Sequence, residues 1–220
     1  MLRVPVQAVV PQVSFAPQKG NPFRRVLLDV FPRLRDAQAK QEARMYPFFR
    51  MVKELWKYRR APALPILGTH RSTHICWPWD LDPWRELNNG RTLTLYDLGR
   101  LPLARRAGVD RVLRAKGWGL TVAGNTTRYR RRVRMFDRLE MVSRCIGWDA
   151  RFIYMDQSMW KGGECTSHMI IRSAIVGKSG IVPPKELIAA MGQDVDSPDL
   201  PEWVQAWILA ENARPWPPQR

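Results

Sequence analysis

The sequence predicts an α+β fold in which a largely antiparallel sheet wraps around one long central helix, with a helical extension on its N-terminal side. Two observations lead to this prediction. Residues 89–106 have a helical pattern that is apolar over much of the circumference, as in a buried helix. Four stretches with strand patterning follow, separated by short turns, at residues 118–129, 133–146, 152–160 and 164–176. Consecutive strands joined by short turns favour antiparallel pairing.

The composition indicates a globular chain with an anionic partner. Apolar residues make up 45% of the 220 residues, which is enough for a hydrophobic core. The net charge of +16 points to nucleic acid, an anionic membrane surface or a phosphate-bearing ligand such as coenzyme A; the alternative is a basic solvated surface. No apolar run reaches the roughly 18 residues that span a bilayer, and prolines interrupt the start where a signal peptide would need an apolar segment.

Cysteine and histidine usage favours a cytoplasmic protein without a metal site. The 3 cysteines form no C-x-x-C pair, which argues against a disulfide framework and a structural zinc site. The 3 histidines include no H-E-x-x-H pair. We therefore expect no metal ion. We also expect no bound cofactor.

The N-terminal extension, residues 1–68, is expected to start without regular structure. Pro5, Pro11 and Pro17 predict an extended or disordered lead over residues 1 to about 20. A helical pattern then begins at Asn21 and ends or kinks at Pro32.

Residues 47–60 are predicted to form the second helix of the extension. Its apolar side chains share one face, and its basic residues lie mostly elsewhere. This pattern indicates a helix that packs on its own domain or on a sister subunit. The alternative is peripheral contact of residues 47–60 with a membrane.

A proline-rich connector, residues 61–68, separates the extension from the main domain, residues 69–192, and a tail follows at residues 193–220. The main domain is expected to open with a strand at residues 70–79. Short helices are predicted at residues 109–116, 183–191 and 201–212.

The segment between the first strand and the long helix has the strongest catalytic signal in the chain. It holds the carboxylates Asp80, Asp82 and Glu86, followed by Asn88 and Asn89 at the start of the helix. A carboxylate can attack a carbonyl or activate water, and the free N–H groups of a first helical turn can stabilise an oxyanion. Asp80 fits a structural role better than Asp82, and Asn88 is the expected helix cap.

This segment and the predicted architecture together resemble the hotdog-fold acyl-CoA thioesterases, in the branch related to 4-hydroxybenzoyl-CoA thioesterases. The resemblance runs from about Arg71 to Gly192. The stretches that carry it are Asp82-Pro83-Trp84, Leu87-Asn88-Asn89-Gly90-Arg91, Asp97-Leu98-Gly99-Arg100, Val122-Ala123-Gly124, Arg128-Tyr129-Arg130-Arg131, Gly147-Trp148-Asp149 and Val182-Pro183-Pro184.

The resemblance implies an acyl-CoA thioesterase that acts on a fatty or aromatic acyl group. Asp82 would be the nucleophile or the general base, and the backbone N–H of Asn89 would hold the oxyanion. Glu86 stands where the family often has histidine, and it would relay a proton or orient water. Hotdog relatives join two sheets edge to edge with the active site at that interface, so we expect a homodimer or a homotetramer.

Arg128, Arg130 and Arg132 are the predicted contacts for the phosphates of coenzyme A, because alternate residues of a strand share one face. A solvated strand edge is the alternative. A nucleic-acid binder fits less well, because only Tyr129 offers a stacking ring and it would point away from the arginines. The remaining alternative function is a non-catalytic hotdog module that binds acyl-CoA or a protein partner.

Overall fold

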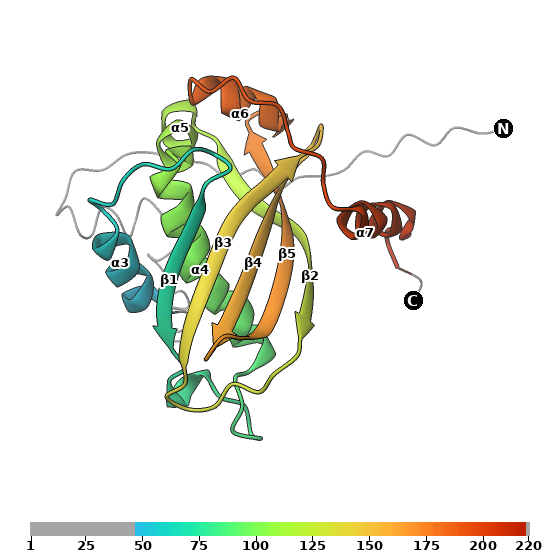
Figure 1. Ribbon diagram of the computed structural model, residues 1–220. Helices are drawn as coiled ribbons and strands as arrows, with labels where there is room; N and C mark the ends of the chain where they lie inside the picture. The colour runs from blue at the N-terminus through green and yellow to red at the C-terminus, as the bar shows by residue number, and fades with distance from the viewer. Residues whose placement is uncertain (1–46, 219–220) are drawn as a thin grey trace, which may run out of the picture.

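The structure, a computed structural model, describes residues 47–218, and in it an antiparallel sheet curls around one long helix (Figure 1). The strands are β1 (Thr69–Ile75), β2 (Gly119–Tyr129), β3 (Arg138–Trp148), β4 (Phe152–Lys161), β5 (Glu164–Gly177) and β6 (Gly180–Val182). The helices are α3 (Phe48–Lys57), α4 (Asn89–Arg106), α5 (Val109–Lys116), α6 (Pro184–Ala190) and α7 (Glu202–Ala213), with a 3-10 turn at Pro78–Asp80. The predicted lead and first helix lie outside the described residues.

The sheet has the strand order β1-β3-β4-β5-β2, and every pair is antiparallel. The short strand β6 pairs with the end of β5. Strands β3, β4 and β5 are successive neighbours, whereas β2 lies at the far edge beside β5. No residue of β2 is buried, and its apolar Leu120 and Val122 are exposed. Among residues 47–218, the sheet therefore ends in a long edge that no other element covers.

Helix α4 is the central helix of the predicted hotdog arrangement, and its bounds match the predicted range. Its buried side chains, among them Leu95, Tyr96 and Leu98, face the concave side of the sheet. Gly99 lies directly against β3, since a Cβ atom there would meet Ser143 Oγ at 2.5 Å and Met141 Sδ at 2.6 Å. Only glycine permits this close approach of helix and sheet.

Strand β3 shows the alternation that the sequence predicts. Leu139, Met141, Ser143 and Cys145 are buried on the α4 side, while Arg138 and its alternate neighbours face away. This period of two places one face of the strand in the core.

Helix α3 packs against its own domain, as predicted. Met51 and Leu55 are buried and join the main core, whereas Phe49 is 94% exposed and Trp56 is 58% exposed. Contact of residues 47–60 with a membrane stays a prediction. Within residues 47–218, no helix combines the length and the apolar character needed to cross a bilayer.

Helix α7 covers part of the outer face of the sheet, opposite α4. Val204 of α7 is fully buried and forms a second, smaller cluster with Tyr154 and Ile170. The sequence neighbours of these two strand residues belong to the main core, so the small cluster lies on the other face. Arg172 and Glu211 join the sheet to α7 through an ion pair of 3.2 Å.

Two predicted strand boundaries are wrong, namely the end of the first strand and the start of the strand predicted at residues 133–146. The first strand stops at Ile75 because Pro78 starts a 3-10 turn. The strand predicted from Val133 begins only at Arg138. The carbonyl of Val133 accepts the N–H of Leu87 instead, which ties this segment to the acidic loop.

Candidate active site

The segment from Asp80 to Asn88 forms a tight loop between β1 and α4, which we call the acid loop. Its two arms are joined by the N–H of Asn88 to the carbonyl of Asp80 at 2.9 Å and the N–H of Asp82 to the carbonyl of Glu86 at 2.8 Å. Arg85 turns the chain with a φ of 60°, a left-handed conformation that costs free energy for a residue other than glycine.

The carboxylate of Asp82 is held in place by the backbone of its own loop. Its Oδ1 accepts the N–H of Trp84 at 2.9 Å and that of Glu86 at 3.1 Å. Within residues 47–218, no hydrogen bond is made to Oδ2, and the residue is only partly buried. Asp82 therefore presents one fixed and one available carboxylate oxygen.

Asp80 has a different environment and a structural role. It is fully buried, and its carboxylate accepts hydrogen bonds from Arg50 at 2.7 Å, Arg91 at 3.1 Å and the N–H of Trp77 at 3.0 Å. These contacts tie α3 and the first turn of α4 to the acid loop. The contact with Arg50 was missed, because nothing local in the sequence links a residue of α3 with a carboxylate 30 positions later.

The start of α4 leaves one backbone N–H available. Asn88 is the cap, as predicted, and its Oδ1 accepts the N–H of Arg91 at 3.1 Å. The side chain of Asn89 accepts the N–H of Gly90 at 2.7 Å. The N–H of Asn89 itself has no hydrogen-bond partner in the part of the chain that the structure describes. It stands at the positive end of the helix dipole, where an oxyanion is stabilised.

The backbone N–H of Glu86 donates to the carboxylate of Asp82, whereas the side chain of Glu86 pairs with a different residue. Its Oε1 lies 3.1 Å from Nε of Arg132, and the two side chains are 31% and 73% exposed. This ion pair connects the acid loop with the segment that follows β2. The backbone of Glu86 thus contacts the predicted catalytic carboxylate of Asp82, whereas its side chain forms an ion pair with Arg132.

The predicted arginine row does not form. The chain leaves the sheet after Tyr129, and the backbone N–H groups of Arg130 and Arg131 both donate to the carbonyl of Thr166. Arg128 lies on the outer face opposite His168 of β5. The shared face that we expected for Arg128, Arg130 and Arg132 requires a strand, so that geometric expectation is wrong.

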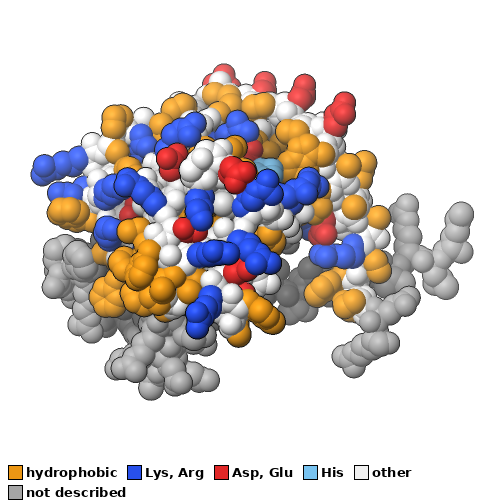
Figure 2. Space-filling view, turned by 60° about the horizontal axis from the view of Figure 1, so that its bottom comes forward, with side chains coloured by type: hydrophobic (Ala, Val, Ile, Leu, Met, Phe, Trp, Pro, Cys, Tyr) orange, Lys and Arg blue, Asp and Glu red, His pale blue; other side chains and the backbone are white. Residues whose placement is uncertain are grey.

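Basic side chains are nevertheless abundant at this end of the molecule. Figure 2 views the molecule from the end of the acid loop, and Lys and Arg side chains spread across it among apolar ones. An anionic substrate would be attracted to such a surface.

A buried polar network between α4 and the sheet was not predicted. Gln157 is fully buried and donates to the carbonyl of Tyr96 and to Ser143 Oγ, both at 2.8 Å. Arg100 donates to Gln157 Oε1 at 3.1 Å, and Tyr96 shares a hydrogen bond of 2.9 Å with Ser167. The sequence signal that could have predicted this network is a glutamine, Gln157, at a strand position that faces the core.

The two histidines of β1 are buried in the neutral form. Burial lowers the pKa of His70 to about 4 and that of His74 to about 3. His74 Nε2 lies 2.8 Å from Ser72 Oγ, and Arg106 donates to His70 Nδ1 at 3.0 Å. No cluster of three or more His, Cys, Asp or Glu side chains that could hold a metal ion occurs between residues 47 and 218.

Comparison with known proteins supports the fold described above. A sequence profile described as the thioesterase-like superfamily matches residues 76–208. Protein THEM6 of Xenopus laevis is 30% identical over 184 residues, which are 83% of this chain and 81% of that protein.

Two solved structures share the fold at low sequence identity. A probable thioesterase of Escherichia coli, YbaW, aligns with a TM-score of 0.52 and 16% identity over 56% of this chain and 96% of its own. SAV2348 of Staphylococcus aureus, described in complex with CoA, aligns with a TM-score of 0.52 and 11% identity over 63% of this chain and 93% of its own.

Proposed function

Because this chain belongs to the thioesterase-like superfamily, we propose that it hydrolyses an acyl-CoA thioester with Asp82 as the catalytic carboxylate. One observation carries the proposal. Backbone amides hold one oxygen of Asp82 and leave the other available, and the N–H of Asn89 at the start of the adjoining helix is available too. A thioesterase needs such a pair, because one group activates the nucleophile and the other stabilises the oxyanion.

In the general-base route, the available oxygen of Asp82 accepts a proton from water while the water oxygen attacks the thioester carbonyl. The N–H of Asn89 donates to the developing oxyanion at the helix terminus. The tetrahedral intermediate then collapses, the C–S bond breaks, and the proton on Asp82 passes to the CoA thiolate. The products are a carboxylic acid and coenzyme A.

In the nucleophilic route, the same oxygen attacks the carbonyl carbon and expels the thiolate, which leaves a mixed anhydride on Asp82. Water then hydrolyses the anhydride. Mass spectrometry of the protein after a single rapidly quenched turnover tests for the anhydride. An acyl group on Asp82 demonstrates the nucleophilic route.

Glu86 acts in this proposal by orienting rather than by transferring a proton. Its N–H fixes Asp82, and its carboxylate is matched by Arg132 at 3.1 Å. Arg132, beside the acid loop, and Arg130, on the same connecting segment, are the proposed contacts for CoA phosphates, since guanidinium binds phosphate well. A fatty or aromatic acyl group is the proposed specificity.

We also propose a homodimer that pairs β2 of one protomer with β2 of its partner. The exposed edge of β2 offers unpaired backbone groups and apolar side chains, and pairing with a second copy satisfies both. Light scattering of the purified protein tests this, and a monodisperse monomer at micromolar concentration contradicts it.

The decisive experiment measures release of free thiol from acyl-CoAs of several chain lengths by the wild type, Asp82→Asn and Asp110→Asn. Asp110 pairs with Arg114 on the surface of α5 and is the matched control. We expect Asp82→Asn to lower kcat/KM at least about 100-fold, in the range reported for general acid–base residues, with the control unchanged. Saturable acyl-CoA binding without any turnover by the wild type would instead indicate a non-catalytic binding module.

A further inference from the structure

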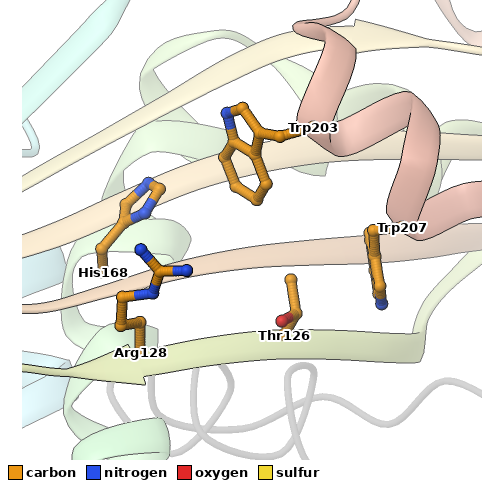
Figure 3. Close-up of a pocket in the computed structure, with 5 residues that line it drawn as sticks. All are labelled: Thr126, Arg128, His168, Trp203 and Trp207. Atoms are coloured by element: carbon orange, nitrogen blue, oxygen red, sulfur yellow. The ribbon is translucent and has the colours of Figure 1, made fainter.

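The outer face of the sheet carries a cavity that α7 partly covers (Figure 3). Its volume is about 400 Å³. The residues that line it are Thr126, Arg128, His168, Trp203 and Trp207. It lies on the face opposite α4, so it is separate from the acid loop and from the polar network beneath α4.

The backbone fixes the position of the charged side of the cavity. Arg128 of β2 and His168 of β5 are directly paired in the antiparallel register. Side chains at paired positions project from the same face and lie side by side. In Figure 3 the guanidinium and the imidazole both lie at the end of the cavity away from Trp207.

The aromatic side of the cavity is fixed by α7. Trp203 and Trp207 are one helical turn apart, so both face the sheet. Trp207 packs edge-on against Tyr154 with ring centroids 6.5 Å apart, and Trp203 packs edge-on against His168 at 5.6 Å. Trp203 remains 49% exposed, so part of its indole is accessible to a ligand.

The charge of the cavity is positive and unmatched. None of the lining residues is acidic. The nearby carboxylate of Asp156 is already shared by His168 at 2.9 Å and Arg144 at 2.8 Å. Arg128 has no carboxylate partner among residues 47–218, although many other arginines of this chain do. A guanidinium next to open indole rings suits a ligand that is both anionic and aromatic.

We propose that this cavity is a binding site for a small aromatic anion. The ring of the ligand packs against Trp203 and Trp207, and its phosphate or carboxylate receives hydrogen bonds from Arg128. Thr126 offers a hydroxyl at the floor. Phosphorylated aromatic compounds, nucleotides among them, have this chemistry. The site is outside the proposed thioester chemistry, because the sheet lies between it and α4.

Isothermal titration calorimetry of the full chain with 1-naphthyl phosphate tests the proposal. We expect saturable binding to the wild type and roughly tenfold weaker binding to Arg128→Gln and to Trp203→Ala. Arg111→Gln and Trp216→Ala are the matched controls, because both residues are exposed and lie outside the cavity. Inorganic phosphate should bind at least about tenfold more weakly than the aromatic probe.

Three results would overturn the proposal. They are no saturable binding, equal affinity for inorganic phosphate and the aromatic probe, and Arg128→Gln or Trp203→Ala binding within twofold of the wild type. Circular dichroism confirms that each variant is folded. Asp82→Asn should bind the probe like the wild type, so a failure of this site is distinguishable from a failure of the proposed thioesterase activity.

Discussion

Replacing Asp80 by alanine should destabilise the protein more than replacing Asp82, although both are aspartates of the same loop. Asp80 is fully buried, and its partners Arg50 and Arg91 are only 16% and 20% exposed at the side chain. Removing it takes away the buried carboxylate that both guanidinium groups share. Breaking a buried pair in this way costs about 3 to 5 kcal/mol. The partial access of both arginines to water favours the lower end, about 3 kcal/mol.

The variant Asp82→Ala provides the comparison for this loss of stability. Asp82 is partly exposed and accepts two backbone N–H groups, which water can reach in its absence. At about 1 kcal/mol for each net hydrogen bond, Asp82→Ala should lose about 1 to 2 kcal/mol. The surface variant Asp110→Ala, which removes a solvent-exposed ion pair on α5, should lose less than about 1 kcal/mol.

Urea denaturation followed by circular dichroism gives the three free energies of unfolding, with thiol release measured on the same samples. We expect Asp80→Ala to lose the most stability and Asp82→Ala to lose the most activity relative to folded protein. The reasoning is refuted if Asp80→Ala is as stable as Asp110→Ala, or if Asp82→Ala is the least stable of the three.

Three further outcomes follow from the packing and protonation described above. Gly99→Ala should lower the free energy of unfolding by about 1 to 3 kcal/mol, because the added methyl group collides with β3; an unchanged Tm would contradict this. Asn88→Ala should cost about 1 kcal/mol through loss of the α4 cap, measured by urea denaturation. The folded pKa values of His70 and His74 lie below 6.5, so the unfolded chain binds more protons and stability should fall as pH drops from 6.5 toward 4.5. The slope should approach about 1.4 kcal/mol per pH unit for each histidine, and His74→Gln should reduce it.

Local patterns predicted α4 and the central strands because local physics determines them. Asn88 supplies a helix cap at the position where the apolar period begins, and the predicted helix bounds match the structure. The alternation along β3 likewise identified the buried face. Both features depend on residues that are close in sequence.

Other features depend on distant contacts and were wrong or missed. The predicted strand stopped at residue 146, but Gly147 still lies in β3, at the point where the register with β4 shifts. Trp148 continues the strand by pairing with Ile153 of β4, and its N–H donates to Ser197 of the tail, 49 residues later. Strand β6 has only 3 residues, too few for a periodic signal. The contact between Arg50 and Asp80 also has no local signature.

Helix α7 occupies part of the outer face of the sheet, which a second sheet would need for face-to-face stacking. Two sheets can stack only if their outer faces are free, and here Val204 is buried in that face while Glu211 pairs with Arg172. Stacking sheet on sheet would require the helix to detach, with loss of its buried apolar contacts and that ion pair. We therefore expect any assembly beyond the proposed β2-paired dimer to use a surface other than the outer face of the sheet, because α7 already occupies part of that face.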